Sequence, residues 1–300
     1  MMERPVFWLL YTEYGAEKNA PFIAMLKDAG DRLGLTGQLM IAEDLSFSDS
    51  DILYRGERIT PPAFALNRTY DAVACTDVVL ARRLEACGVP VYNGAEVSLL
   101  AGDKYRTYRT FKSVVPMMKT VLWGDVMQDG EITLPFPYPV VAKPRDSHGG
   151  TGVTLCPDAA ALRRYADTQK DFLIQETADP GRDVRVYMVG GEIFGAVERR
   201  ADRSSDIRAN FSLGGSVSRY ELSGDETRLV RKIAEALSAQ GNFIFGGIDL
   251  IFRGGKAYLN EIEDAAGTRM LYATGANKKD GDDITVHYLA AAKRAAGITI

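Results

Sequence analysis

The chain contains the stretch Gly246-Gly247-Ile248-Asp249-Leu250-Ile251-Phe252, then Arg253-Gly254-Gly255, then Lys256-Ala257-Tyr258-Leu259-Asn260-Glu261-Ile262-Glu263. Two apolar runs with strand-like composition flank a short loop that contains two glycines. Such an arrangement predicts a β-hairpin. Its carboxylates interrupt an otherwise apolar pattern, which makes the hairpin a candidate functional site.

The register of this hairpin determines where its carboxylates point. Side chains alternate along a strand, so we expect Leu259, Glu261 and Glu263 on one face. A three-residue loop, 253–255, would pair Asp249 with Leu259 and place Asp249 diagonal to Glu261. A two-residue loop would turn Asp249 to the opposite face. The hypothesis of a carboxylate cluster therefore depends on the longer loop.

Three carboxylates on one face of an apolar hairpin repel one another and need cations. Hard oxygen ligands in this number suit Mg²⁺ held together with substrate phosphates. A solvated acidic face on an edge hairpin would give the same sequence pattern. The hairpin alone leaves both interpretations open.

The composition is that of an ordinary globular protein. The chain has 300 residues, of which 46% are hydrophobic and 25% charged, and this length can hold one large domain or two to three smaller ones. The net charge of −4 argues against nucleic acid as the main partner, because no basic excess is present to neutralise phosphates.

The cysteines and the hydropathy pattern indicate the cytoplasm. Cys75, Cys87 and Cys156 form no CxxC pair, which favours buried thiols in a reducing compartment over a disulfide or metal framework. The first residues lack the pattern of a secretion signal. No apolar run reaches the roughly 18 residues that a membrane span needs. We expect a cytoplasmic protein without membrane contact.

Strand and helix patterns alternate along the first third of the chain. Strands are predicted at residues 6–11, 38–42, 64–66 and 89–92, and helices at residues 16–33 and 77–86, with Asn93 capping the next helix. This alternation predicts a small α/β domain with a mainly parallel sheet over residues 1–95.

The remaining patterns predict an α+β arrangement in two subdomains, residues 96–174 and 175–300. The expected elements are a basic helix from residue 103, strands at 140–144, 153–155 and 172–176, a helix at 157–167, a hairpin of 183–189 with 192–200, a helix at 225–239, the hairpin quoted first, and a last helix at 284–296. The turn Gly190-Gly191 is a strong hairpin signal.

A glycine-rich loop follows the strand that ends in Lys143. Ser147, Gly149, Gly150 and Gly152 belong to it, and glycines let backbone amides approach an anion closely. The loop matches neither GxxxxGK[ST] nor GxGxxG, so an ordinary turn would explain it as well. Lys143 favours a phosphate role, because a lysine at a strand end supplies a point charge.

A polar loop, 206–215, contains a further candidate. Arg208 and Asn210 stand two positions apart, and an arginine held there can bind a transferring phosphoryl group bidentately. A salt bridge between Arg208 and Asp206 within the loop is the simpler alternative.

Taken in order, these pieces resemble the ATP-grasp family. The likeness is greatest to RimK-like ribosomal-protein glutamate ligases and extends more distantly to prokaryotic glutathione synthetases. It covers about residues 91–296 and rests on eight motifs. Each motif is common by itself, but their occurrence in this order is specific to the family. These are Val91-Tyr92-Asn93 leading to Asp103-Lys104, Val141-Ala142-Lys143-Pro144, Ile174-Gln175-Glu176, Asp183-Val184-Arg185, Ala196-Val197-Glu198-Arg199-Arg200, Arg208-Ala209-Asn210, Gly247-Ile248-Asp249 and Glu261-Ile262-Glu263.

The resemblance implies an ATP-grasp fold in which the two subdomains clasp ATP. Lys104 and Lys143 would contact its phosphates, under the glycine loop. Glu176 and Thr177 would lie on the hinge that pairs with adenine, and Asp183 near the ribose. The implied nucleotide-binding residues are Lys104, Lys143, Ser147, Gly149, Gly150, Gly152, Gln175, Glu176, Thr177 and Asp183.

The resemblance also implies the metal and catalytic residues. Asp249, Glu261 and Glu263 would bind two Mg²⁺ ions, with Mn²⁺ as an alternative. Arg208 and Asn210 would stabilise the γ-phosphate and an acyl phosphate.

Two departures from the family pattern bear on the substrate. Relatives usually carry asparagine where Glu263 stands, so the extra negative charge would either raise the metal affinity or leave Glu263 needing a partner such as Lys278 or Lys279. The Ser-Pro-Gly that commonly follows is replaced by 264–269, a segment that borders the acceptor site in relatives. Arg269 could bind a substrate carboxylate or form a structural salt bridge.

The activity implied by the resemblance is ATP-dependent ligation of a carboxylate to an amine through an acyl phosphate. Glutamate or another amino acid would be the amine donor, and the substrates would be small molecules or peptides. Two alternatives stay open, a small-molecule kinase of the ATP-grasp type and a non-catalytic ATP-binding scaffold. The sequence does not determine the substrates or whether the chain forms a homo-oligomer.

Overall fold

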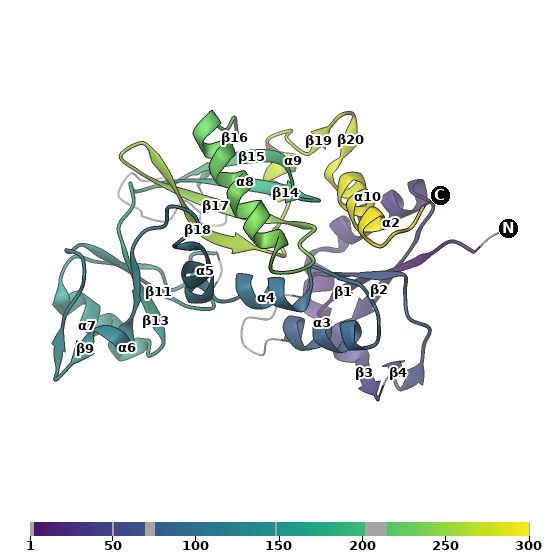
Figure 1. Ribbon diagram of the computed structural model, residues 1–300, viewed down its shortest axis with the longest axis horizontal. Coiled ribbons are helices and arrows are strands. Elements are labelled where there is room, and N and C mark those ends of the chain that lie inside the picture. Colours follow the sequence, from purple (N-terminus) through teal and green to yellow (C-terminus); the bar gives the residue numbers. More distant parts are fainter. Residues whose placement is uncertain (1–2, 50, 70–75, 148, 202–214, 300) are drawn as a thin grey trace.

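A computed structural model describes residues 3–49, 51–69, 76–147, 149–201 and 215–299. Three sheets organise these residues in chain order, an N-terminal parallel sheet, a central antiparallel sheet and a larger C-terminal antiparallel sheet. Figure 1 shows the central part at one end of the molecule and the N-terminal sheet at the other, with the C-terminal sheet and α8 between them. No helix among the described residues is both long and apolar enough to cross a membrane.

The N-terminal sheet has the predicted parallel arrangement, with the strand order β2-β1-β6-β7. Its strands are β1 (Val6–Tyr11), β2 (Thr36–Ile41), β6 (Phe64–Asn67) and β7 (Val91–Tyr92), and its helices are α1 (Glu13–Lys18), α2 (Ala20–Arg32), α3 (Thr76–Ala86) and α4 (Ala95–Ala101). The single helix predicted over 16–33 is wrong, because Asn19 ends α1 and begins α2, with proline in the first turn.

A small antiparallel sheet escaped prediction. It consists of β3 (Leu45–Ser48), β4 (Asp51–Tyr54) and β5 (Glu57–Arg58). The 3₁₀ turn η1 (Ala42–Asp44) leads into it. Its strands are short, and their side chains are mostly half-buried or exposed, so they lack the apolar runs by which the other strands were recognised.

The central part comes after α5 (Lys104–Phe111) in the chain and contains the sheet β12-β11-β13-β8. Its elements are β8 (Thr120–Leu122), α6 (Trp123–Val126), β9 (Met127–Gln128), β10 (Glu131–Ile132), β11 (Val140–Pro144), β12 (Thr154–Cys156), α7 (Ala159–Thr168) and β13 (Phe172–Glu176). Asp158 caps α7 by accepting a hydrogen bond from Ala161 N at 2.8 Å.

The C-terminal sheet has the order β16-β15-β14-β17-β18, all antiparallel. Its elements are β14 (Arg182–Val189), β15 (Glu192–Arg200), β16 (Ser216–Tyr220), α8 (Gly224–Ser238), β17 (Phe245–Arg253) and β18 (Lys256–Glu263), followed by α9 (Arg269–Ala273), β19 (Lys278–Lys279), β20 (Asp282–Asp283) and α10 (Ile284–Ala295). The apolar stripe of α8 packs on one face of the sheet, and α10 returns to lie against α2 (Figure 1).

The register of the hairpin β17–β18 differs from the prediction. Arg253 pairs with Lys256, so the loop has only two residues, and both glycines in it have positive φ angles of 56° and 76°. This is the geometry that two-residue hairpins prefer. The predicted three-residue loop and its pairing of Asp249 with Leu259 are therefore wrong.

A β-bulge restores the carboxylate cluster that a two-residue loop alone would have dispersed. The register shifts between Asp249 and Leu250, so that Asn260 is the extra residue and Asp249 pairs directly with Glu261. Leu259 and Ile262, three positions apart, are both buried in the apolar core. Leu259 therefore does not share the face of Glu261, contrary to the prediction.

Asn93 also has a different role from the predicted one. Gly94 occupies the N-cap position of α4. The Asn93 side chain instead hydrogen-bonds to the backbone of the C-terminal sheet. The boundaries drawn at residues 95 and 174 stay predictions.

The close approach of β17 and β18 at their open end gives a stability prediction. A Cβ added at Gly246 would lie 2.7 Å from the carbonyl oxygen of Glu263 and 2.6 Å from the Phe243 ring. We expect Gly246→Ala to lower the free energy of unfolding by about 1–3 kcal/mol through overpacking, measured by urea denaturation. Gly124→Ala is the control, because a Cβ there meets no atom within 4 Å. Equal unfolding midpoints for the two variants would contradict the packing at Gly246.

Candidate functional site

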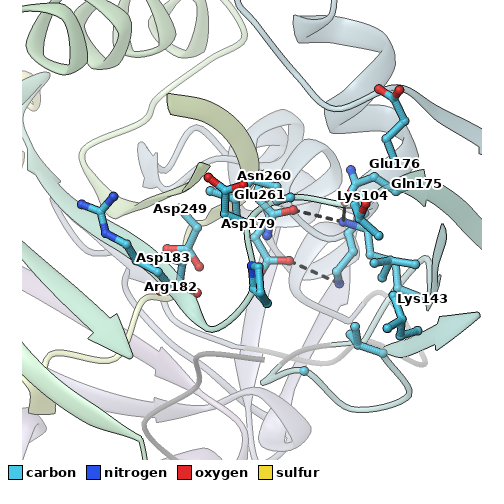
Figure 2. Close-up of a pocket in the computed structure, with 18 of the residues that line it drawn as sticks. Lys104, Lys143, Gln175, Glu176, Asp179, Arg182, Asp183, Asp249, Asn260 and Glu261 are labelled. Carbon is cyan, nitrogen blue, oxygen red and sulfur yellow. Dashed lines mark hydrogen bonds and ion pairs between the residues drawn. The ribbon is translucent and has the colours of Figure 1, made fainter. Parts of the chain in front are cut away.

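A cavity of about 320 Å³ lies between the central sheet and the C-terminal sheet. Small-molecule sites typically measure about 300–1,000 Å³. Figure 2 shows Lys104 and Lys143 on one side of it and Asp183 and Asp249 on the other. The predicted site residues that line it are Lys104, Lys143, Ser147, Gly150, Gln175, Glu176, Thr177, Asp183, Asp249 and Glu261.

Lys104 reaches the cavity from the first turn of α5. Asp103 caps this helix by accepting hydrogen bonds from Tyr105 N and Arg106 N, at 2.8 and 3.1 Å. The Lys104 side chain is 7% exposed, and its Nζ donates to the carbonyl oxygen of Ser147 and lies 3.8 Å from Glu261 Oε2. The helix start therefore connects the glycine loop with the carboxylate cluster.

Lys143 is held by neutral groups. Its Nζ donates to Gln175 Oε1 at 3.0 Å and to Asn260 Oδ1 at 3.2 Å, while Gln175 Nε2 donates to Thr120 Oγ1 at 2.9 Å. No carboxylate among the described residues lies within ion-pair distance of it. Burial lowers the pKa of Lys143 to about 8. The ammonium is thus fixed in position, without a counter-ion in the part of the chain that the structure describes.

The glycine loop folds back over the end of β11. Gly149, Gly150 and Gly152 all have positive φ angles, and a Cβ at Gly152 would lie 2.7 Å from the Pro144 ring. Tyr165 donates a hydrogen bond to the Gly152 carbonyl at 2.8 Å and anchors the loop. Gly149 and Gly152 shape the loop without lining the cavity, and His148 lies outside the described residues.

The opposite wall begins where β13 ends. Glu176 N donates to the Lys119 carbonyl at 3.0 Å, and Arg253 Nη1 lies 3.4 Å from Glu176 Oε1. The neighbouring wall is apolar and is formed by Pro139, Val141, Val153, Leu155, Pro180 and Ile251. A flat aromatic group fits this chemistry.

Two buried arginines hold the acidic side of the cavity. Arg185 donates to both carboxylate oxygens of Asp249, at 2.7 and 2.6 Å, and Arg199 donates to Asp249 at 2.7 Å. Arg199 also binds Asp183, at 2.5 and 3.0 Å. Burial raises the pKa of Asp183. For Asp249 the two guanidinium groups outweigh burial and hold the pKa well below its usual range.

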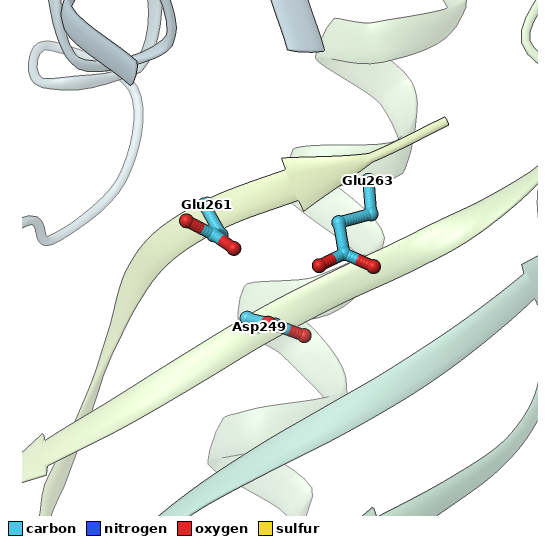
Figure 3. A group of neighbouring side chains, drawn as sticks. All are labelled: Asp249, Glu261 and Glu263. Atoms are coloured by element: carbon cyan, nitrogen blue, oxygen red, sulfur yellow. The ribbon is translucent and has the colours of Figure 1, made fainter. Parts of the chain in front are cut away.

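Asp249, Glu261 and Glu263 form a carboxylate cluster, with ligand atoms that all lie within 4.8 Å of one another. Figure 3 shows Glu261 and Glu263 on one strand and Asp249 on the adjacent strand, pointing toward a common space. Arg185 Nη1 lies 2.5 Å from Glu263 Oε2. The partner of Glu263 is therefore Arg185 and not Lys278 or Lys279, the partners named as one alternative from the sequence.

The carboxylate cluster fits a hard divalent cation. Its donors are carboxylate oxygens, which Mg²⁺ prefers. Each oxygen has two lone pairs, so the arginine contacts leave acceptor capacity. Arg185 and Arg199 would orient the ligands in the way that hydrogen-bonding partners commonly do behind a metal site.

Four other predicted residues are not among the described residues that line the cavity, and one of them, Glu263, belongs to the carboxylate cluster beside it. Arg208 and Asn210 lie outside the described residues, so their predicted catalytic roles stay predictions. Arg269 is the first residue of α9 and is exposed.

Sequence reasoning assigned no role to Arg185, Arg199 or Asn260. The first two were quoted as motif residues, and their signal is a charged side chain inside an apolar strand, where burial demands a partner. Asn260 had a weaker signal, the three-residue spacing of Leu259 and Ile262, which breaks strand alternation and marks a bulge.

Comparison with known proteins assigns the fold. Residues 101–283 match the RimK-like ATP-grasp domain. The chain belongs to the RimK-like ATP-grasp family. A probable alpha-L-glutamate ligase of Xanthomonas campestris pv. campestris is 29% identical to this RimK-like chain over 206 residues, which cover 66% of the chain and 69% of the relative.

Two solved structures share the fold. D-cycloserine synthetase DcsG aligns with a TM-score of 0.70 at 14% identity, over 97% of this RimK-like chain and 99% of that chain. The ATP-grasp ligase PsnB, complexed with minimal precursor, Mg and ADP, aligns with a TM-score of 0.64 at 14% identity, over 95% and 96%. The predicted family, the ATP-grasp fold and the assignment to ATP-dependent ligases are confirmed.

The environment of Lys143 predicts how nucleotide affinity depends on pH. A phosphate attracts the protonated ammonium, and the protonated fraction of Lys143 falls as the pH rises through about 8. We expect the dissociation constant of ATP to rise above pH 8, by up to roughly tenfold per pH unit, in equilibrium titrations. Lys143→Arg should keep its charge and give a flatter curve above pH 8. Parallel curves for the two proteins would contradict a phosphate contact by Lys143.

Proposed function

We propose that the protein is an ATP-dependent carboxylate–amine ligase that forms an amide or peptide bond. The γ-phosphoryl group of ATP passes to a substrate carboxylate, giving an acyl phosphate and ADP. An amine then attacks the acyl carbon, the bond to the phosphate oxygen breaks, and phosphate leaves as the amine loses a proton. No covalent bond to the protein is required, so the chain acts through positioning and charge stabilisation.

The proposal rests on one observation, the position of two lysines beside a cluster of carboxylates. The cavity brings Lys143, which has no carboxylate partner among the described residues, and Lys104, whose Nζ lies 3.8 Å from Glu261 Oε2, beside the carboxylate cluster. Phosphates suit the lysines, and a divalent cation suits the carboxylates. An apolar wall on the hinge side suits the adenine ring, as the predicted roles of Glu176 and Thr177 require.

ATP and Mg²⁺ are the cofactors that this site fits. Mg²⁺, when bound, would neutralise the charge of the transferring phosphoryl group. We assign its ligands to Asp249, Glu261 and Glu263, and we infer two ions, with Mn²⁺ able to replace Mg²⁺. The PsnB structure with Mg and ADP supports the cofactor assignment.

The other residues predicted to contact the nucleotide are assigned to its phosphates or to its ribose. We assign Lys104, Lys143, Ser147 and the loop glycines to the phosphates, Gln175 to the positioning of Lys143, and Asp183 to the ribose. Arg208 and Asn210 are proposed to stabilise the acyl phosphate. The loop would exclude water from this hydrolysable species.

The substrates are proposed to be small molecules or peptides. The relative named a probable alpha-L-glutamate ligase supports glutamate as a substrate, which we assign as the amine donor, and a PsnB structure with a precursor peptide supports a peptide as a substrate. We place the reaction in the cytoplasm, without nucleic acid as a partner, in three domains divided near residues 95 and 174. A homo-oligomer is compatible with this assignment.

The proposal predicts phosphate release that depends on Mg²⁺ and on a particular pair of carboxylate and amine. We expect Glu261→Gln to lower that rate by roughly a hundredfold or more, because a group that helps neutralise transition-state charge is lost. Glu57→Gln, at an exposed glutamate of β5, should leave the rate unchanged. The measurement is phosphate release against a panel of amino acids and peptides, with mass spectrometry of the amine.

Other outcomes would point elsewhere. ADP and a phosphorylated product without free phosphate would indicate a kinase. Tight ATP binding without turnover on any acceptor would favour an ATP-binding scaffold. Equal rates for Glu261→Gln and Glu57→Gln would overturn the assignment of the carboxylate cluster.

A further inference from the structure

One residue of the N-terminal domain reaches the open end of the hairpin formed by β17 and β18. Asn93 is fully buried, and its Nδ2 donates to the carbonyl oxygens of Phe245 at 2.6 Å and Asp264 at 2.7 Å. Its Oδ1 accepts from Ile244 N at 2.9 Å. The amide thus binds β17 near its start and the residue that follows β18.

These contacts begin where the strand ladder stops. The last pair between β17 and β18 is Gly247 with Glu263, next to which Asp264 leaves the sheet. Asn93 joins the two chain segments just beyond that pair. A single side chain therefore fixes how far apart the two strands lie at the end where Glu263 emerges.

Two further residues from the first hundred positions of the chain hold the segment after β18. Ser98, on α4, donates to Asp264 Oδ2 at 2.6 Å. Arg68 Nη2 donates to the carbonyl oxygens of Ala265 and Ala266, at 3.3 and 3.1 Å. The Arg68 guanidinium lies over the Phe22 and Phe245 rings, so both domains enclose it.

We propose that Asn93 is a positioning residue for the divalent-metal site, acting through the backbone at the open end of the hairpin. This inference rests on the proposed function, because it assigns the carboxylate cluster to Mg²⁺. Asp249 lies on β17, and Glu261 and Glu263 lie on β18, so their separation depends on the spacing of the two strands. Asn93 holds that spacing from outside the sheet.

The chemistry of the contacts explains why an amide is required. Asn93 donates to two carbonyl oxygens and accepts from a backbone N–H, so its side chain satisfies both kinds of group at once. A carboxylate in its place would face two carbonyl oxygens without a hydrogen to offer. An alanine would leave buried carbonyl groups without their partner. Either change frees the two segments to separate.

The test measures metal dependence separately from stability. We expect Asn93→Ala to raise the Mg²⁺ concentration that half-saturates binding of a fluorescent ATP analogue, by about 10–100-fold, the loss typical of residues that support metal ligands. Analogue binding without Mg²⁺ should stay within a factor of two or so, because the lysines are untouched. Asn19→Ala is the matched control, since Asn19 Nδ2 donates to a backbone carbonyl within the N-terminal domain at 2.8 Å.

Ser98→Ala provides a second variant if Asn93→Ala does not fold. It removes one hydrogen bond to Asp264 and should raise the half-saturating Mg²⁺ concentration in the same direction by a smaller factor. An unchanged Mg²⁺ dependence in the folded variants, with lower thermal stability alone, would overturn the inference and leave a structural role. Absence of Mg²⁺-dependent binding in the unmodified protein would overturn the proposed function instead.

Discussion

The buried charge of Asp249 is the constraint on which the site depends. Its side chain is almost inaccessible to water, and a buried carboxylate without a partner would cost several kcal/mol. Arg185 and Arg199 supply the opposing charge, and each of them binds a second carboxylate, Glu263 or Asp183. Because removing one partner of such a pair costs about 3–5 kcal/mol, β14, β15, β17 and β18 are coupled through charge as well as through their backbone ladders. The same network fixes the direction of the oxygens that a metal would meet.

The bulge at Asn260 is what makes this network compatible with a tight hairpin. The loop Gly254-Gly255 sets a two-residue turn, which by simple alternation would place Asp249 and Glu261 on opposite faces. One extra residue on β18 changes the alternation, so that Leu259 and Ile262 both stay in the core. Asn260 then faces the cavity and accepts from Lys143. The single extra residue thus allows a two-residue turn, a buried apolar face and a carboxylate cluster in the same hairpin. At the end of the hairpin away from the turn, the N-terminal domain holds the two strands.

The sequence predicted the parts of the protein that local patterns encode. The parallel N-terminal sheet, the strands β11, β13, β14 and β15, and the amphipathic helix α8 follow from periodicity and turn chemistry, and the order of motifs identified the ATP-grasp family. The hairpin register was wrong because a bulge depends on packing between two strands, which alternation along one strand cannot show. The partner of Glu263 was missed for a related reason. Arg185 lies far away in sequence, and only the pairing of β14 with β17 brings it near. The contacts of Asn93 cross between domains and have no local signal, so a helix cap was the natural expectation.

The basic residues of the site divide by chemical type, and the division has a physical reason. The arginines bind carboxylates, where a planar guanidinium donates to two oxygens at once and keeps its charge. Lys143 instead meets neutral acceptors, Gln175 and Asn260, which orient the ammonium without neutralising it. A carboxylate partner would compensate the charge of a lysine and weaken its attraction for a phosphate, whereas the two neutral acceptors of Lys143 leave that charge in place and use two of its three N–H donors. The cavity therefore keeps its permanent ion pairs on the carboxylate side and leaves positive charge available on the opposite side, where an anionic ligand would complete it.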